Sequence, residues 1–217
     1  MAELRGALGA VFKGAAAIYS KNLVFSDGSN TITNSDDLFV TKGFSGDQVV
    51  LVYGSTSNDG VYNVDTVAAG TLTLEETTTA ETPSTAVLIY TAAPGTQVTG
   101  FYNWQLDWTH NVMDATDFAD AGSKTYIAGD TGWTATAQAH WMTDEDVESL
   151  FGTELIVRFF VKYSASPSAP APVYLYEGLA IMSGMQVDTN VNELVQRPLT
   201  FTGVGPLIYR AYTAYPS

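Results

Sequence analysis

Residues 102–108 alternate strictly between large apolar and polar side chains. A period of two places one face of a β-strand on a core and the opposite face in water. The segment Phe101–Trp108 is therefore expected to be a half-buried strand. Its core face would carry Tyr102, Trp104, Leu106 and Trp108.

The same alternation returns in residues 133–141, where alanine fills most apolar positions and predicts close packing by another element. A short helix is expected at residues 144–151, because Thr143 is a good N-cap and Gly152 can end it. The proline-rich segment Ser164–Pro172 cannot join a ladder and is expected to form an extended loop. Further strands are predicted at residues 155–163, 173–182, 184–188, 194–202 and 206–212.

Residues 24–94 have the pattern of a separate small β domain. A strand at residues 49–53 precedes the turn Ser57–Gly60, whose Asn and Asp before Gly favour the positive φ angles of a hairpin. Three more strands are predicted at residues 61–67, 70–74 and 86–91. The expected fold class is therefore mainly β, with residues 24–94 inserted between residues 1–23 and 95–217.

The N-terminal residues admit two interpretations. Apolar residues from Leu4 to Tyr19 have helical spacing, whereas the glycines between them each weaken a helix by about 1 kcal/mol. A strand over residues 7–13 with a flexible arm before it is the preferred interpretation. Glu3 and Lys13 do not suit a signal peptide, so synthesis in the cytoplasm without export is expected.

The chain of 217 residues has 9 basic and 23 acidic side chains, and its formal charge is −14. Such a chain is a poor ligand for the phosphates of nucleic acid and for an anionic membrane. Charged residues make up only 15%, against about 25% in an average soluble domain. Either partner proteins cover much of the surface, or the surface is rich in threonine and alanine.

No motif for catalysis or cofactor binding is present. The absence of cysteine removes thiol nucleophiles and thiolate metal sites. His110 with Asp114 and Asp117 would need a helix to form a metal cluster, but this segment favours strand or loop. Gly203–Pro206 is expected to be a turn rather than a phosphate-binding loop, because proline lacks an N–H donor. No enzyme activity, metal or cofactor is expected.

Several stretches in order along the chain resemble the tail tube (major tail) proteins of long-tailed bacteriophages. Phe101–Trp108 resembles the family's F-x-x-W-x-L-D strand, and the loop after it is similar as well. A strand beginning at Gly132 with the helix after it, and the opening strand Gly6–Lys13, add to the likeness. Leu199–Leu207 resembles the closing hairpin of the family.

This resemblance implies a β-sandwich or barrel core with one flanking helix, and an appended domain on the outside. Six copies would form a ring whose strands join across subunits around a channel, and rings would stack into a tube. Tape-measure, terminator and distal tail proteins would be the partners. DNA would pass through a negatively charged lumen without specific binding, in a virion tail assembled in the host cytoplasm.

The resemblance also suggests which residues would take part. The lumen-facing acidic candidates are Asp107, Asp188 and Glu193. The candidates for contacts between rings come from the N-terminal arm and the proline-rich loop. They are Met1, Ala2, Glu3, Leu4, Arg5, Ser164, Ala165, Ser166, Pro167, Ser168, Ala169, Pro170, Ala171 and Pro172.

Two other functions stay open. A tail terminator or connector of the same fold would form single rings that do not stack. A surface carbohydrate-binding β-sandwich module would use the aromatic strands as platforms, and it would need an export signal.

Overall fold

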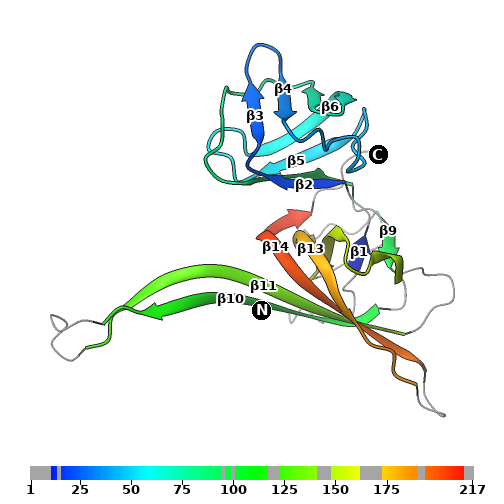
Figure 1. Cartoon of the computed structure of the whole chain (residues 1–217). Helices are drawn as coiled ribbons and strands as arrows, with labels where there is room; N and C mark the ends of the chain where they lie inside the picture. Colours follow the sequence, from blue (N-terminus) through cyan, green and yellow to red (C-terminus); the bar gives the residue numbers. More distant parts are fainter. Residues whose placement is uncertain are drawn as a thin grey trace.

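The computed structural model of the chain describes residues 11–13, 16–93, 96–98, 101–116, 123–140, 148–161, 173–189 and 194–212. Within these ranges the protein consists of two seven-stranded antiparallel sheets, one above the other in Figure 1. The expected mainly β fold class is confirmed. No helix in the described part of the chain is long and apolar enough to cross a membrane.

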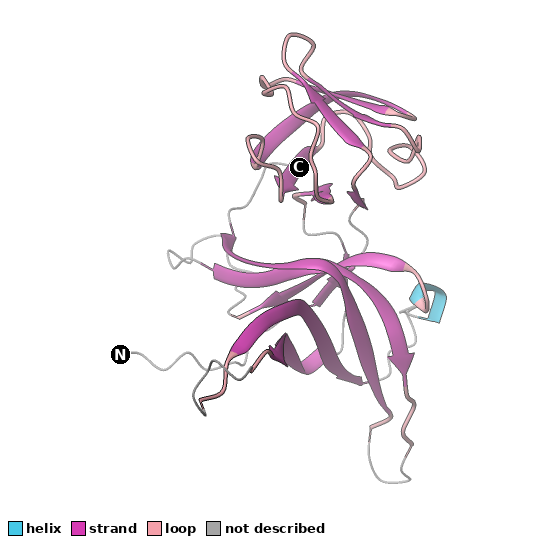
Figure 2. Ribbon diagram, turned by 60° about the vertical axis from the view of Figure 1, so that its left-hand side comes forward, coloured by secondary structure: helices cyan, strands magenta, loops and turns pink. Residues whose placement is uncertain are grey.

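The first sheet contains the long strands of the C-terminal half, in the order β10-β11-β14-β13-β12-β1-β9. Its strands are β1 (Val11–Lys13), β9 (Thr96–Val98), β10 (Phe101–Asp114), β11 (Tyr126–His140), β12 (Glu154–Phe160), β13 (Val173–Met185) and β14 (Gln196–Tyr212). Figure 2 shows the strong curvature of this sheet, which encloses its own apolar core.

The second sheet has the order β2-β8-β5-β6-β7-β4-β3 and encloses a separate core. We predicted that this unit begins at residue 24. In the structure it begins at Ala17, because β2 belongs to this sheet and its residue Ile18 is buried in this core. The strands are β2 (Ala17–Ser20), β3 (Leu23–Ser26), β4 (Thr31–Asn34), β5 (Val49–Tyr53), β6 (Gly60–Ala68), β7 (Thr71–Leu74) and β8 (Val87–Thr91).

The predicted helix at residues 144–151 is only partly within the described residues. There it is a single 3-10 turn, η2 (Glu148–Leu150), rather than an α-helix. Phe151 leaves the turn at once to form a β-bridge with Met182. Gly152 ends the turn with a φ of +75°, a conformation that glycine adopts without strain.

The alternation predicted for β11 is confirmed, because Trp133, Ala135, Ala137 and Ala139 are all buried. In β10 the same prediction holds only for Trp104 and Leu106, which pack against the core. Tyr102 and Trp108 are 49% and 57% exposed. Trp108 pairs with Trp133, just beyond Thr134, where the β11–β14 ladder ends, so it stays exposed at the start of the two-stranded part of β10 and β11. A register shift separates Tyr102 from the regular part of β10.

The prediction of a turn and a closing hairpin around Gly203–Pro206 is wrong, because these residues lie inside the 17-residue strand β14. The glycines serve the packing of Trp133, whose indole N–H donates a hydrogen bond to the Gly205 carbonyl at 3.2 Å. A Cβ atom on Gly203 would lie 2.2 Å from this indole, and one on Gly178 would lie 2.6 Å from it. The indole therefore lies directly on the backbone of β13 and β14.

We expect Gly203→Ala to destabilise the protein by about 1–3 kcal/mol, because a methyl group there overlaps a buried indole that cannot move away. Chemical denaturation measures this difference. Gly132→Ala is the matched control, since its Cβ would meet its nearest neighbour at an ordinary 3.9 Å. Equal stability of the Gly203→Ala variant and the control would contradict this account of β14.

Candidate functional site

The two sheets are joined by a buried apolar seam. Leu51, Leu88 and Tyr90 from the second sheet pack against Ile156 and Ile208 from the first. Each of these side chains is at most 9% exposed. The seam excludes water from both sheets, so polar groups within it require partners inside the protein.

The Glu177 carboxylate is the charged centre of this seam. It accepts hydrogen bonds from Arg158 Nε at 2.9 Å, from Arg210 Nε, and from the Tyr90 hydroxyl at 2.5 Å. Burial by itself would raise the pKa of Glu177, but Arg210 and Arg158 hold it below its usual 4.5. Burial and the same carboxylate raise the pKa of Tyr90, so its hydroxyl remains a donor at neutral pH.

Arg158 connects this centre to the chain that leaves the second sheet. Its two terminal nitrogens each donate a hydrogen bond of 2.6 Å, one to the Thr91 carbonyl and one to the Ala93 carbonyl. The Arg158 side chain is fully buried. The second sheet is thus fixed to the first by side-chain and backbone contacts, in addition to the covalent connection.

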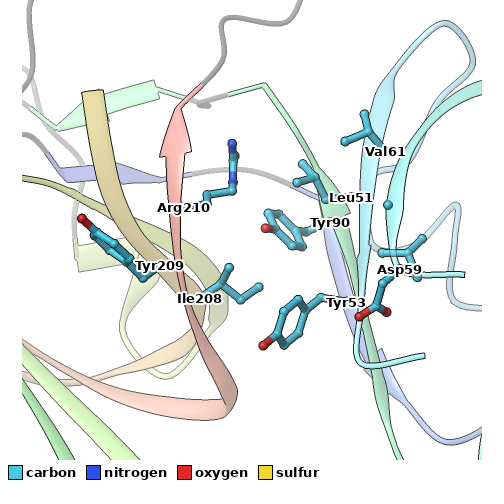
Figure 3. Close-up of a pocket in the computed structure, with 10 residues that line it drawn as sticks. Leu51, Tyr53, Asp59, Val61, Tyr90, Ile208, Tyr209 and Arg210 are labelled. Atoms are coloured by element: carbon cyan, nitrogen blue, oxygen red, sulfur yellow. The ribbon is translucent and has the colours of Figure 1, made fainter. Parts of the chain in front are cut away.

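A solvent-open cavity of about 380 Å³ lies beside the seam. Figure 3 shows that Ile208 and Arg210 of β14 point toward the second sheet, whereas Tyr209 points away from it. Tyr53, 41% exposed, closes the opposite wall, and Asp59 lies at the edge. The lining is mainly apolar, so this cavity offers few groups for a polar ligand.

Strand β10 forms one edge of the first sheet, and no described strand pairs with its outer side. It runs for 14 residues with neither lysine nor proline. Natural proteins usually protect long edges with such residues, because an unpaired edge can pair with another chain. Beyond the core, β10 and β11 project from the body as a long ribbon (Figure 1).

The far part of this ribbon exposes several large apolar side chains to solvent. Val112 and Met113 of β10 and Tyr126 and Ile127 of β11 are 52–62% exposed. Met113 lies directly opposite Ile127 in the ladder, so these two side chains share one face. Four exposed apolar side chains on a projecting ribbon indicate a surface that another molecule covers.

A polar strip covers the outer face of the same sheet at the base of the ribbon. In it, Asp107 pairs with Thr134, which pairs with Thr202 on β14. The strip consists of the exposed residues Asn103, Gln105, Asp107, Thr134, Thr136, Gln138, Ser183, Thr200 and Thr202. None of these nine residues is basic, and Asp107 is the one charged residue among them.

The structure places two of the three predicted lumen residues in relation to this strip. Asp107 lies within it, and Asp188 pairs with Gln196, which lies on β14 four residues, or about 14 Å, before the strip residue Thr200. Glu193, the arm Met1–Arg5 and the segment Ser164–Pro172 lie outside the described residues. Among the described residues, no group of three His, Cys, Asp or Glu side chains could hold a metal ion.

Sequence reasoning missed the Glu177 centre, although a signal was present. Arg158 and Glu177 each stand alone within a run of apolar residues on a predicted strand. A single charge in such a run must be paired if both faces of the strand are buried. The sequence could not show that the two charges face each other, because their strands pair only in the folded sheet.

The chain matches no known protein family, and a search of curated proteins found none with significant similarity.

We expect Glu177→Gln to lower the free energy of unfolding by about 3–5 kcal/mol at pH 7, because it leaves Arg158 buried without a counter-charge. Since the folded-state pKa is below 4.5, the charge contributes fully above that pH and less as pH falls through the folded pKa. The difference in the free energy of unfolding between the wild type and the variant should therefore become smaller as the pH falls. Denaturation curves measured from pH 7 to pH 3 test this.

Glu154→Gln is the matched control, because Glu154 forms an exposed ion pair with Lys42 at 2.7 Å. Its loss should cost about 0–1 kcal/mol. A Glu177→Gln variant as stable as this control would show that the buried carboxylate does not hold the sheets together.

Proposed function

We propose that this protein is a structural virion protein, the tail tube protein of a long-tailed bacteriophage. Copies assemble into six-membered rings, and rings stack into a tube through which DNA passes into the host. Tape-measure, terminator and distal tail proteins are its further partners. It is not an enzyme, and it acts in the virion tail after assembly in the host cytoplasm.

The observation that carries this proposal is the exposed β10–β11 ribbon at the edge of the first sheet. An unpaired edge of 14 residues can extend a sheet from one subunit into the next. A ring formed in this way has no free edge, as in a closed barrel. The apolar side chains at the far end of the ribbon supply contact area beyond the edge itself.

The polar strip supports the channel. A strip with one acid and no base offers DNA phosphates no charged contact, so binding to it is weak. In a ring that joins the first sheets edge to edge, one sheet face lines the channel. The strip suits that position, because its amide and hydroxyl side chains point away from the apolar core of the first sheet.

Heterologous contacts within a ring close on themselves, whereas head-to-tail contacts between stacked rings do not close and can build a filament. This distinguishes a tube from a terminator or connector, which forms one ring only. The 380 Å³ cavity does not favour a carbohydrate-binding module, because its lining is mainly apolar.

Negative-stain electron microscopy of the purified protein at high concentration tests the proposal. Hollow tubes with a regular ring repeat are expected. Isolated rings would favour the terminator or connector, and a persistent monomer would reject self-assembly.

We expect Met113→Ser with Ile127→Ser to prevent or weaken assembly without unfolding the protein. Both side chains are more than half exposed in a single copy, so they contribute little to its core. Burial of each in an interface is worth about 1.5–3 kcal/mol. The critical concentration for assembly, measured by sedimentation, should therefore rise at least about 100-fold.

The control variant is Val24→Ser with Val40→Ser, which removes two exposed apolar side chains from the second unit. It should assemble like the wild type. If the two variants assemble equally well, the ribbon is not an assembly surface.

We expect Asp107→Lys tubes to keep their normal length but to retain short DNA duplexes at low salt and release them at high salt. The new base provides a charged contact for phosphate on the strip, whereas none of the strip residues in the wild type is basic. Co-sedimentation with labelled DNA measures retention. Asp65→Lys, the same charge change at an exposed site of the second unit, should retain much less. Short or absent Asp107→Lys tubes would reject the lumen placement.

A further inference from the structure

A groove runs along the boundary between the two sheets, next to the base of the ribbon. Two adjoining cavities of about 340 and 150 Å³ form it and share part of their lining. Its walls are Tyr19, Tyr53 and Trp108, which are 38%, 41% and 57% exposed. Its floor is glycine backbone, including Gly132 and Gly205. We call this the aromatic groove.

The groove has hydrogen-bond donors but no charge. The hydroxyls of Tyr19 and Tyr53 and the indole N–H of Trp108 bond to none of the residues that the structure describes. No charged side chain lines either of the two cavities. Flat aromatic walls with outward donors are the features that bind polyproline II segments, whose carbonyls have no internal partner.

The chain itself contains such a segment. Ser164–Pro172 reads Ser-Ala-Ser-Pro-Ser-Ala-Pro-Ala-Pro, and it is uncharged. Polyproline II has three residues per turn, so Pro167 and Pro170 fall on the same side. Two uncharged surfaces can meet between copies that each carry a charge of −14 without bringing like charges together.

The segment of the same copy is too short to occupy the groove. It belongs to the connection of residues 162–172, whose ends are held together where the Val161 N–H bonds to the Tyr174 carbonyl. A connection of 11 residues must extend away from the sheet and return to it, so its tip lies at most about 19 Å from its two ends. Val173 pairs with Tyr212, which is five residues, or about 17 Å, along β14 from the nearest groove residue, Leu207. Only the tip of a fully extended connection would reach that edge, so an extended run of the same copy cannot lie along the groove.

We propose that the aromatic groove binds the segment Ser164–Pro172 of a second copy of this chain, in the polyproline II conformation. The inference rests on the self-assembly proposed above and names its acceptor surface. Each copy then offers one segment and one groove, a heterologous contact that can continue from subunit to subunit. The second sheet has a role in assembly, because it supplies Tyr19 and Tyr53.

Directed disulfide formation tests the contact, since the chain has no cysteine of its own. Full-length Ser168→Cys protein is mixed with full-length Thr131→Cys protein under mild oxidation, because Thr131 lines both cavities. We expect linked heterodimers on non-reducing gels at several times the rate seen with Thr77→Cys. Thr77 is also exposed and lies outside the groove. Adding Trp108→Ala to the Thr131→Cys chain should abolish the preference.

A synthetic peptide of residues 164–173 provides a measurement that does not depend on assembly. Calorimetry with the Met113→Ser, Ile127→Ser protein should show saturable binding. A peptide with its three prolines replaced by alanine should bind at least about tenfold more weakly, as should the Tyr53→Phe protein, which lacks one donor.

The outcomes separate the two proposals. Tubes with no cross-linking preference for Thr131→Cys overturn the groove contact and leave the tube function standing. Peptide binding without tubes or rings supports the groove and rejects the function. An intrachain disulfide in dilute Ser168→Cys, Thr131→Cys double variant overturns the second-copy assignment. Absence of tubes, cross-links and peptide binding overturns both.

Discussion

A single buried carboxylate determines how the two halves of this protein fit together. The charge of Glu177 is balanced by Arg158 and Arg210, and its carboxylate accepts a hydrogen bond from the hydroxyl of Tyr90 in the other sheet. A buried carboxylate without such partners would be strongly unfavourable, so the four groups can exist only as a set. The aromatic groove and the mainly apolar cavity both lie along the boundary that this set maintains.

Glycine has a complementary role in the first sheet. Trp133 is buried against Gly178 and Gly203, where any side chain would overlap the indole. This packing closes the core at the point where the β10–β11 ribbon leaves it. Trp108, the cross-strand partner of Trp133, consequently remains exposed on the ribbon and becomes part of the groove. One tryptophan of the pair stabilises the core and the other is available to a partner.

The low charge content is explained by where polar and apolar groups lie. The outer strip of the first sheet is mostly amide and hydroxyl, the ribbon exposes large apolar side chains, and the groove is lined by aromatic rings. A chain with these three surfaces exposed is suited to being surrounded by copies of itself. Few of its acidic residues lie at the proposed contacts, since the ribbon strands contain three and the groove contains none.

The sequence alone determined the mainly β class, the positions of most strands and the buried alternation of β11, because these follow from local side-chain periodicity. It misread Gly203–Pro206 as a turn, because glycine and proline mark turns locally, whereas here the indole of a distant strand requires Gly203 and the ring of Tyr19 lies against Gly205. It also predicted a fully buried face for β10, since periodicity does not reveal where the core ends. Only the tertiary structure decided that Asp107 belongs to a strip without bases and that Arg158 faces Glu177. Both facts depend on strand pairing between residues far apart in the chain, and the residue pattern within one strand does not encode its partners.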